Sequence, residues 1–176
     1  EQGLYIYNIE TKETPMLKAI LILPFNVLIS IPLLILYFSG FEPIEIKNIF
    51  LLFLASILFA SGLILMIWTM KLFAQVGKGS PAPWNPINKL ITAGPYAYVR
   101  NPMLLGVFLF LGGECLMFQS WPLFYYLLIF IGINVLYFPL VEEKGLYKRY
   151  GKTYLEYKRN VPRFLPRLTP YHPTKN

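Results

Sequence analysis

The sequence predicts an all-α integral membrane protein with four clear transmembrane helices, and it leaves room for a fifth. The chain has 176 residues, of which 56% are hydrophobic and 14% are charged, whereas about 25% of the residues in a typical soluble domain are charged. The apolar residues gather in four runs, which polar or Gly/Pro-rich turns separate. Because lipid offers backbone amides no outside partner, such runs are expected to be helices.

The first two apolar runs, Leu17–Phe38 and Ile49–Phe73, are each long enough to span a hydrocarbon core of about 30 Å. A short turn at 40–43 joins them, so the sequence predicts a tight antiparallel hairpin. Ser56 and Ala60 lie four residues apart on the second run, and small residues at this spacing let neighbouring helices approach closely. Chance occurrence in a helix rich in small residues explains the pair equally well.

The third run, Pro102–Phe118, is short for a span and is interrupted by Gly112, Gly113 and Glu114. The fourth run, Trp121–Val141, follows after a turn at 119–122. A fifth membrane-associated helix would arise if the third run consisted of two pieces around the glycines, or if part of the C-terminal tail lay in the membrane interface.

Basic residues predict the orientation of the chain. Nine of the 16 Lys and Arg residues follow Glu143 and four more lie between 71 and 100, whereas the 40–48 segment holds a single Lys. Because cytoplasmic segments carry an excess of Lys and Arg, we expect a multi-pass protein with both termini and the central loop in the cytoplasm. The basic tail is then expected to touch membrane lipid.

Several other classes of protein are excluded by the sequence. No nucleic-acid-binding module accompanies the basic tail. Cys115 is the one cysteine and His172 the one histidine, so neither an internal disulfide nor a Cys/His metal site is expected. The segment 77–80 contains Gly and Lys but lacks the spacing of a phosphate loop. The sequence leaves the oligomeric state open.

A central loop, 75–102, concentrates Gly and Pro residues between two membrane runs. Proline fixes the backbone angle φ, so this loop is expected to be pre-shaped, and loops of this length are usually functional or disordered. Its apolar and aromatic residues, among them Leu90 and Tyr96, predict packing rather than disorder. An ordinary connector between helices is the alternative.

An acidic pair, Glu142 and Glu143, ends the fourth apolar run. A carboxylate at a membrane boundary is costly unless it is paired, hydrated or bound to a ligand. Neighbouring side chains on a helix point about 100° apart, so one of the two at most would face a pocket squarely. The alternative is that both glutamates lie in water at the end of a span.

The tail that follows is expected to be helical and amphipathic over 146–157, with aromatic residues on one face and basic residues on the other. Gly151 is expected to end or kink this helix. Val161–Pro166 is expected to be extended, because it contains two prolines. A membrane-surface anchor is the alternative interpretation of the tail.

Five ordered motifs within about residues 77–168 resemble the isoprenylcysteine carboxyl methyltransferase family, in its archaeal and bacterial branch. More broadly they are similar to the integral-membrane methyltransferases that include phospholipid N-methyltransferases. In this sequence the motifs are Gly79-x-Pro81-x-Pro83, Leu90-x-Thr92-x-Gly94-Pro95-Tyr96-x-Tyr98-x-Arg100-Asn101-Pro102-Met103-x-x-Gly106, Glu142-Glu143-x-x-Leu146, Tyr150-Gly151-x-x-Tyr154-x-x-Tyr157 and Val161-Pro162-Arg163. The resemblance divides the chain into an N-terminal segment with its membrane hairpin, 1–76, and a catalytic region, 77–176.

The resemblance implies methyl transfer from S-adenosylmethionine at the membrane, with S-adenosylhomocysteine as product and a cytosolic cofactor pocket between the central loop and the helical tail. It assigns cofactor binding to Asn88, Lys89, Leu90, Ile91, Tyr96, Asn101, Pro102, Met103, Leu104, Glu142 and Glu143. Glu142 is the carboxylate to test first. Arg100 and Arg163 become candidate catalytic residues that orient an anionic acceptor, and contact with a lipid phosphate is their alternative role.

The first-choice reaction is carboxyl O-methylation of a prenylcysteine-like substrate that enters from the bilayer, since an acceptor carboxylate needs no base. Three positions depart from the family pattern: Asn101 stands at the family's His, Leu104 at its Tyr, and Phe138 at an Arg that eukaryotic members use for the substrate. A lipid amine or a thiol is therefore an alternative acceptor. An NADPH-dependent membrane reductase of the sterol type and a non-catalytic membrane scaffold are alternatives of other classes.

Overall fold

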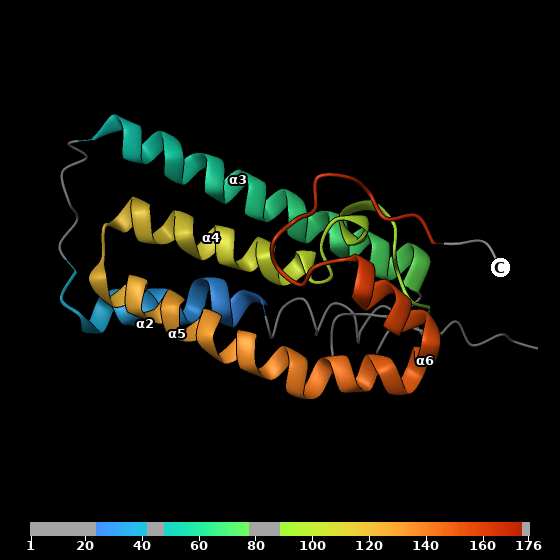
Figure 1. Cartoon of the computed structure of the whole chain (residues 1–176). Coiled ribbons are helices and arrows are strands. Elements are labelled where there is room, and N and C mark those ends of the chain that lie inside the picture. Colours follow the sequence, from blue (N-terminus) through green and yellow to red (C-terminus); the bar gives the residue numbers. More distant parts are fainter. Residues whose placement is uncertain (1–23, 42–47, 78–88, 174–176) are drawn as a thin grey trace, which may run out of the picture.

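The computed structural model describes residues 24–41, 48–77 and 89–173, and every regular element within these ranges is a helix (Figure 1). In chain order they are η1 (Asn26–Ser30), α2 (Ile31–Phe38), α3 (Ile49–Leu72), η2 (Phe73–Gly77), η3 (Gly94–Ala97), α4 (Pro102–Phe118), α5 (Trp121–Tyr137), η4 (Phe138–Glu142) and α6 (Glu143–Asn160). The elements η1, η2 and η4 are π-helical turns next to longer helices, and η3 is a 3₁₀ turn. The first part of the predicted run Leu17–Phe38 lies outside the described residues.

Two continuous helices in the described part are long and apolar enough to cross a membrane, Ile49–Gly77 and Trp121–Asn160. Asn26–Phe38 and Pro102–Phe118 are shorter apolar helices. In the second long helix the charged residues begin at Glu142, so its apolar, membrane-spanning part ends at Val141. Helix α4 runs without a break through Gly112 and Gly113, so the expectation that the third run could split there is wrong.

The helix ends follow from local sequence. The side-chain Oδ1 of Asn48 accepts hydrogen bonds from the backbone N–H groups of Phe50 (3.0 Å) and Leu51 (3.4 Å) and so caps α3. Asn101 caps α4 in the same way, with its Oδ1 3.1 Å from the N–H of Leu104, and Pro102 occupies the first helical position, where no N–H is needed.

Helices α3 and α4 pack along a stripe of small residues. A Cβ atom placed on Gly62 would lie 2.6 Å from the carbonyl oxygen of Gly106, and one on Gly113 would lie 3.1 Å from that of Ala55. These contacts recur seven residues apart on each helix, which is the spacing that keeps one seam of two crossing helices in contact. Ser56 and Ala60 are exposed instead, so the expectation that they form a helix contact is wrong, because the seam runs along another face of α3.

The predicted tight hairpin between the first two runs is also not formed. Helix α2 packs against α5, whereas the principal partner of α3 is α4. Figure 1 shows α4 lying between α3 and α2. The close approach that the glycines of α4 allow explains why α3 prefers this helix to its neighbour in the chain.

The described end of the central loop, 89–101, and the tail form one packed body at one end of the bundle, as Figure 1 shows. Four backbone N–H groups bridge them: Arg100 to Pro162 O (2.9 Å), Asn101 to Arg163 O (3.3 Å), Arg167 to Tyr98 O (3.0 Å) and Tyr171 to Ala97 O (2.9 Å). The tyrosine face of α6, with Tyr154 and Tyr157 buried, packs against Leu90. The expectation that this part of the loop is ordered, and that the tail helix is amphipathic, is therefore confirmed.

Gly151 kinks α6, as the sequence predicts, with φ 54° and ψ −128° inside the helix. The kink separates the part of α6 that continues the α5 direction from the part that carries Tyr154 and Tyr157 onto the loop. Backbone angles of this kind are accessible almost only to glycine, because a Cβ atom would meet the adjacent backbone.

Replacing Gly151 with Ala is therefore expected to destabilise the protein by about 1–3 kcal/mol through backbone strain alone. No atom lies within 4 Å of a Cβ placed there, so crowding by neighbours makes no contribution. Melting of the detergent-solubilised variant checks this. Gly145→Ala is the matched control, since its Cβ would meet only Arg149 Nη2 at 3.9 Å; equal melting temperatures for the two variants would contradict the prediction.

Candidate active site

A cavity of about 260 Å³ lies where the bundle meets the packed loop and tail. Four of the residues that the sequence assigns to the cofactor line it together: Asn101, Met103, Leu104 and Glu142. The other lining residues come from the N-terminal helix, the end of α3, and helices α4 and α5: Pro24, Val27, Phe73, Val107, Phe130 and Asn134. Residues distant in the sequence thus share one cavity.

The cavity is apolar with a few polar groups. Its polar lining residues are Asn101, Asn134 and Glu142, and Glu142 is the one charged residue among the described residues that line it. The side-chain nitrogen of Asn134 donates to the carbonyl of Phe130 at 2.8 Å, which leaves its Oδ1 as an acceptor. Sequence reasoning missed Asn134, although an amide inside the apolar run 121–141 is a signal that could have found it.

Glu142 lies just past the apolar part of its helix; it lines the cavity and is also exposed. The protein that surrounds it withdraws water and raises the pKa of its carboxyl group, while the positive charge of Arg149 acts in the opposite direction. Glu142 therefore lines the cavity with the charge of Arg149 acting on it; its contact with the cofactor stays a prediction.

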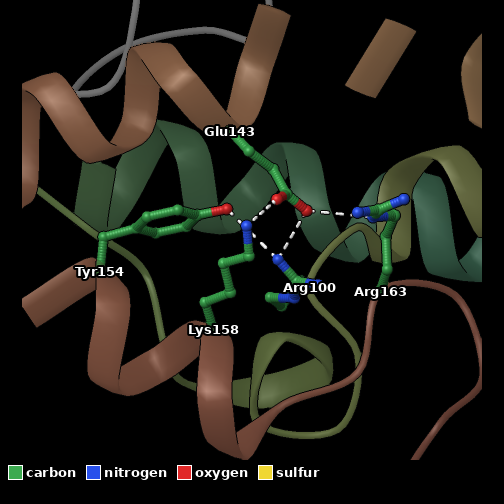
Figure 2. A network of polar contacts seen from close by, with 5 residues as sticks. All are labelled: Arg100, Glu143, Tyr154, Lys158 and Arg163. Atoms are coloured by element: carbon green, nitrogen blue, oxygen red, sulfur yellow. Dashed lines mark hydrogen bonds and ion pairs between the residues drawn. The ribbon is translucent and has the colours of Figure 1, made fainter. Parts of the chain in front are cut away.

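Glu143 points elsewhere and joins a buried cluster of charges (Figure 2). Its Oε1 accepts from Arg100 Nη1 at 2.7 Å and from Arg163 Nε at 3.0 Å, and its Oε2 pairs with Lys158 Nζ. Arg100 also donates to the hydroxyl oxygen of Tyr154 at 3.3 Å. We call these five residues, Arg100, Glu143, Tyr154, Lys158 and Arg163, the clasp, because they tie the loop, α6 and the tail together.

The ion pair at the centre of the clasp, Arg100 with Glu143, is buried. The side chain of Glu143 is 3% exposed and that of Arg100 8%, whereas Lys158 is 43% exposed. Burial alone would raise the pKa of Glu143, but the hydrogen bond from Lys158 and the charges of Arg100 and Arg163 outweigh it and lower that pKa below its usual value of 4.5. Arg100 and Arg163, expected to orient an anionic acceptor, thus both have a carboxylate partner.

Of the remaining candidates, Tyr96 lies next to a residue that lines the cavity. Tyr96 is buried, and its ring centre is 5.9 Å from that of Phe73, a cavity residue. Its carbonyl accepts from the Tyr157 hydroxyl at 2.7 Å, and burial raises the pKa of its own hydroxyl well above 10.0, with the charges of Tyr157 and Glu142 adding to the shift.

The other loop candidates are not among the described residues that line the cavity. Ile91 is 2% exposed, and Leu90 packs on the tyrosine face of α6. Lys89 is exposed, and Pro102 is buried at the start of α4. Asn88 lies outside the described residues.

Phe138 occupies the position at which the resemblance predicts an arginine. Its ring is 4% exposed and lies 6.2 Å, centre to centre, from that of Phe164. Arg163 places its guanidinium 5.9 Å above the Phe138 ring. Phe164 also contacts Phe108 of α4, at 5.7 Å between ring centres, so this part of the tail closes the seam between α4 and the end of α5.

The lowered pKa of Glu143 predicts how acid affects stability. Because the folded pKa lies below the unfolded one, the clasp stabilises the protein fully above pH 4.5 and loses this contribution as the pH falls through the folded value. Melting temperatures of the natural protein and of Glu143→Gln, compared from pH 7 to acid, should differ most above pH 4.5 and converge below it. A difference that widens on acidification would contradict the assignment.

Comparison with known proteins places this geometry in a family. A family model described as phospholipid methyltransferase matches residues 50–153, more than half of the chain. The match includes the cavity residues Asn101 and Glu142, and it ends before Lys158 and Arg163 of the clasp. No curated protein and no solved structure matches the chain. The chain therefore belongs to the phospholipid methyltransferase family and is a membrane methyltransferase.

Proposed function

We propose that the protein transfers a methyl group from S-adenosylmethionine to a lipophilic acceptor, and that the reaction takes place in the cavity bordered by Glu142. The observation that carries the proposal is the charge of this cavity. A single carboxylate stands among apolar side chains, at the boundary of a membrane-spanning helix. A carboxylate in such a place is stabilised by cations and by hydrogen-bond donors. The charge of Arg149 acts on it from outside the cavity lining, and a cationic ligand inside the cavity would add a second favourable partner.

The cavity suits a cationic cofactor. S-adenosylmethionine carries a positive sulfonium and a positive ammonium group, and Glu142 offers a charge-assisted partner for either. The amide oxygen of Asn134 adds a second acceptor, and Met103, Leu104 and Val107 supply apolar surface. When bound, S-adenosylmethionine supplies an activated methyl group on sulfur.

The competing cofactor, NADPH, fits this cavity poorly. Its phosphates require cations or backbone N–H groups. The described lining of the cavity contains no Lys or Arg, and three nearby cations are already engaged by Glu143. These charges support a methyltransferase over a reductase of the sterol type.

The same charges favour an amine as the acceptor over a carboxylate. An anionic acceptor would lie near Glu142 without a cation among the described lining residues, whereas an ammonium headgroup would be attracted to that carboxylate. Glu142 could also hold the proton that an amine must lose before its lone pair attacks. Carboxyl methylation of a prenylcysteine-like substrate, the first choice from the sequence, requires Arg100 or Arg163 to leave Glu143.

Orientation and alignment are the main requirements of a methyl transfer. The chain contributes the capped start of α4, which fixes Asn101, and the packed loop, which holds Tyr96 beside Phe73. We further propose that this end of the bundle faces the cytoplasm, since the last turn of α3, which holds Lys71, and the basic helix α6 lie there.

Ligand-dependent melting of the detergent-solubilised protein tests the cofactor. S-adenosylhomocysteine at 100 times its dissociation constant should stabilise the fold by about 2.7 kcal/mol and raise the melting temperature. NADPH should leave the melting temperature unchanged. A rise with NADPH and none with S-adenosylhomocysteine would show the proposal to be wrong.

A second experiment identifies the acceptor. Radiolabelled S-adenosylmethionine is incubated with the protein in vesicles that contain either phosphatidylethanolamine or a prenylcysteine analogue. Label in the amine-bearing lipid is expected. Label in the prenylcysteine analogue alone, which mild base releases as methanol because the product is an ester, would show that the acceptor is a carboxylate.

A further inference from the structure

The clasp and the cavity are joined through the chain at two points. Asn101 and Glu142 line the cavity, and their immediate neighbours, Arg100 and Glu143, form an ion pair of the clasp at 2.7 Å. Each of these two dipeptides therefore turns one side chain to the cavity and the other to the clasp. The ion pair holds the two cavity walls, the start of α4 and the start of α6, at a fixed separation.

We propose that Glu143 is a positioning residue, which acts through the clasp on Asn101 and Glu142 and does not itself bind the cofactor. The inference rests on the proposed function. It reassigns Glu143, for which the sequence alone suggested contact with the cofactor. Glu143 already accepts from Arg100 and Arg163 on one oxygen and pairs with Lys158 on the other, so its carboxylate is occupied by partners from this chain.

The three cations of the clasp explain why the carboxylate of Glu143 can control the positions of Asn101 and Glu142. Arg100, Lys158 and Arg163 meet around Glu143, and without its negative charge three cations would repel one another in a partly buried space. Arg100 has the least freedom to escape into water, because its side chain is 8% exposed. Its displacement would pull on Asn101, whose side chain caps α4 and whose N–H bonds to Arg163 O.

The clasp also draws its members from three separate segments. Arg100 belongs to the loop, Glu143, Tyr154 and Lys158 to α6, and Arg163 to the tail (Figure 2). A residue with a purely local structural role would stabilise one of these segments. Glu143 instead links all of them at the edge of the cavity, so its loss is expected to alter ligand affinity more than it alters the overall fold.

Hydrogen exchange and cofactor affinity, measured on the full chain in detergent, test the proposal together. In Glu143→Gln, backbone amides at 100–105 and 140–146 should exchange faster, while amides in the middle of α3 keep their protection. S-adenosylhomocysteine, measured by calorimetry, should bind about 10-fold more weakly.

Three further variants keep the test decisive where Glu143→Gln fails to fold. Lys158→Gln removes the most exposed cation of the clasp and is expected to weaken binding about 3-fold. Lys158→Arg restores the charge and should restore affinity. Lys152→Gln removes an exposed positive charge from the same helix, outside the clasp, and should match the natural protein.

The outcomes separate the two proposals. Unchanged exchange at 100–105 and 140–146 in Glu143→Gln, or an unchanged affinity with altered exchange, would overturn the positioning role. The positioning role would also be wrong if Lys152→Gln weakened binding as much as Lys158→Gln. If the natural protein bound no S-adenosylhomocysteine while exchange changed as expected, the proposed function would fail and the mechanical link between Glu143 and the cavity walls would stand.

Discussion

Replacing Glu142 with Gln is expected to weaken the binding of S-adenosylhomocysteine by about 10- to 100-fold and to leave the protein folded, since hydrogen bonds to charged groups contribute about 1.5–3 kcal/mol. Glu142 is the one charged residue among the described residues that line the cavity, and it is exposed. Removal of this charge is therefore expected to lower ligand affinity more than it lowers the stability of the fold. S-adenosylmethionine, which carries the additional sulfonium charge, should lose more affinity than S-adenosylhomocysteine.

Calorimetry with both ligands measures this effect. Glu156→Gln provides the matched control, because it makes the same chemical change on an exposed position of α6 and keeps an oxygen for the hydroxyl of Tyr171. The control should bind both ligands as the natural protein does. Equal affinities for Glu142→Gln and the natural protein, with both folded, would remove Glu142 from the cofactor site.

Replacing Gly62 with Ala is expected to cost about 2–3 kcal/mol of stability, near the upper end for an overpacked core. The added methyl group would lie 2.6 Å from the carbonyl oxygen of Gly106 and 2.8 Å from the backbone nitrogen of Phe110. Both contacts are backbone atoms in the facing helix, so α3 and α4 must move apart along their seam. Such a shift would also disturb the cavity, since Met103, Leu104 and Val107 lie on α4.

Denaturation of the solubilised protein in mixed detergent and denaturant measures the loss. Gly132→Ala is the control, because nothing lies within 4 Å of a Cβ at that position of α5. The control should lose no stability, and alanine's better helix propensity should favour it slightly. A Gly62→Ala variant as stable as Gly132→Ala would show that the close seam between α3 and α4 is not formed in the membrane.

The sequence predicts well whatever depends on local composition. The bounds of α3 and α4, the kink at Gly151 and the amphipathic tail all follow from apolar runs, a glycine and helical periodicity. The resemblance predicts that Asn101 and Glu142 line one cavity, because proteins that share an ordered set of motifs also share the spatial arrangement of those motifs.

What the sequence could not predict depends on which side of a helix meets its neighbour. Ser56 and Ala60 are as small as Ala55 and Gly62, yet only the latter pair lies in the seam with α4. Likewise, the adjacency of two glutamates on a helix predicts that their side chains diverge. It does not predict that the partners of Glu143 come from positions 100, 158 and 163. Such pairings are set by tertiary packing and leave no local periodic signal.

The backbone bonds between 97–101 and 162–171 also fix when the packed body of loop and tail can form. During synthesis the ribosome delivers the loop first, then α4 and α5, and the tail after both. A chain interrupted before Val161 contains all of the apolar runs, but it lacks the tail segment that forms backbone hydrogen bonds with the loop. The packing of the tail against the loop therefore follows the synthesis of every apolar run, and it can form only after residues 162–171 have been translated.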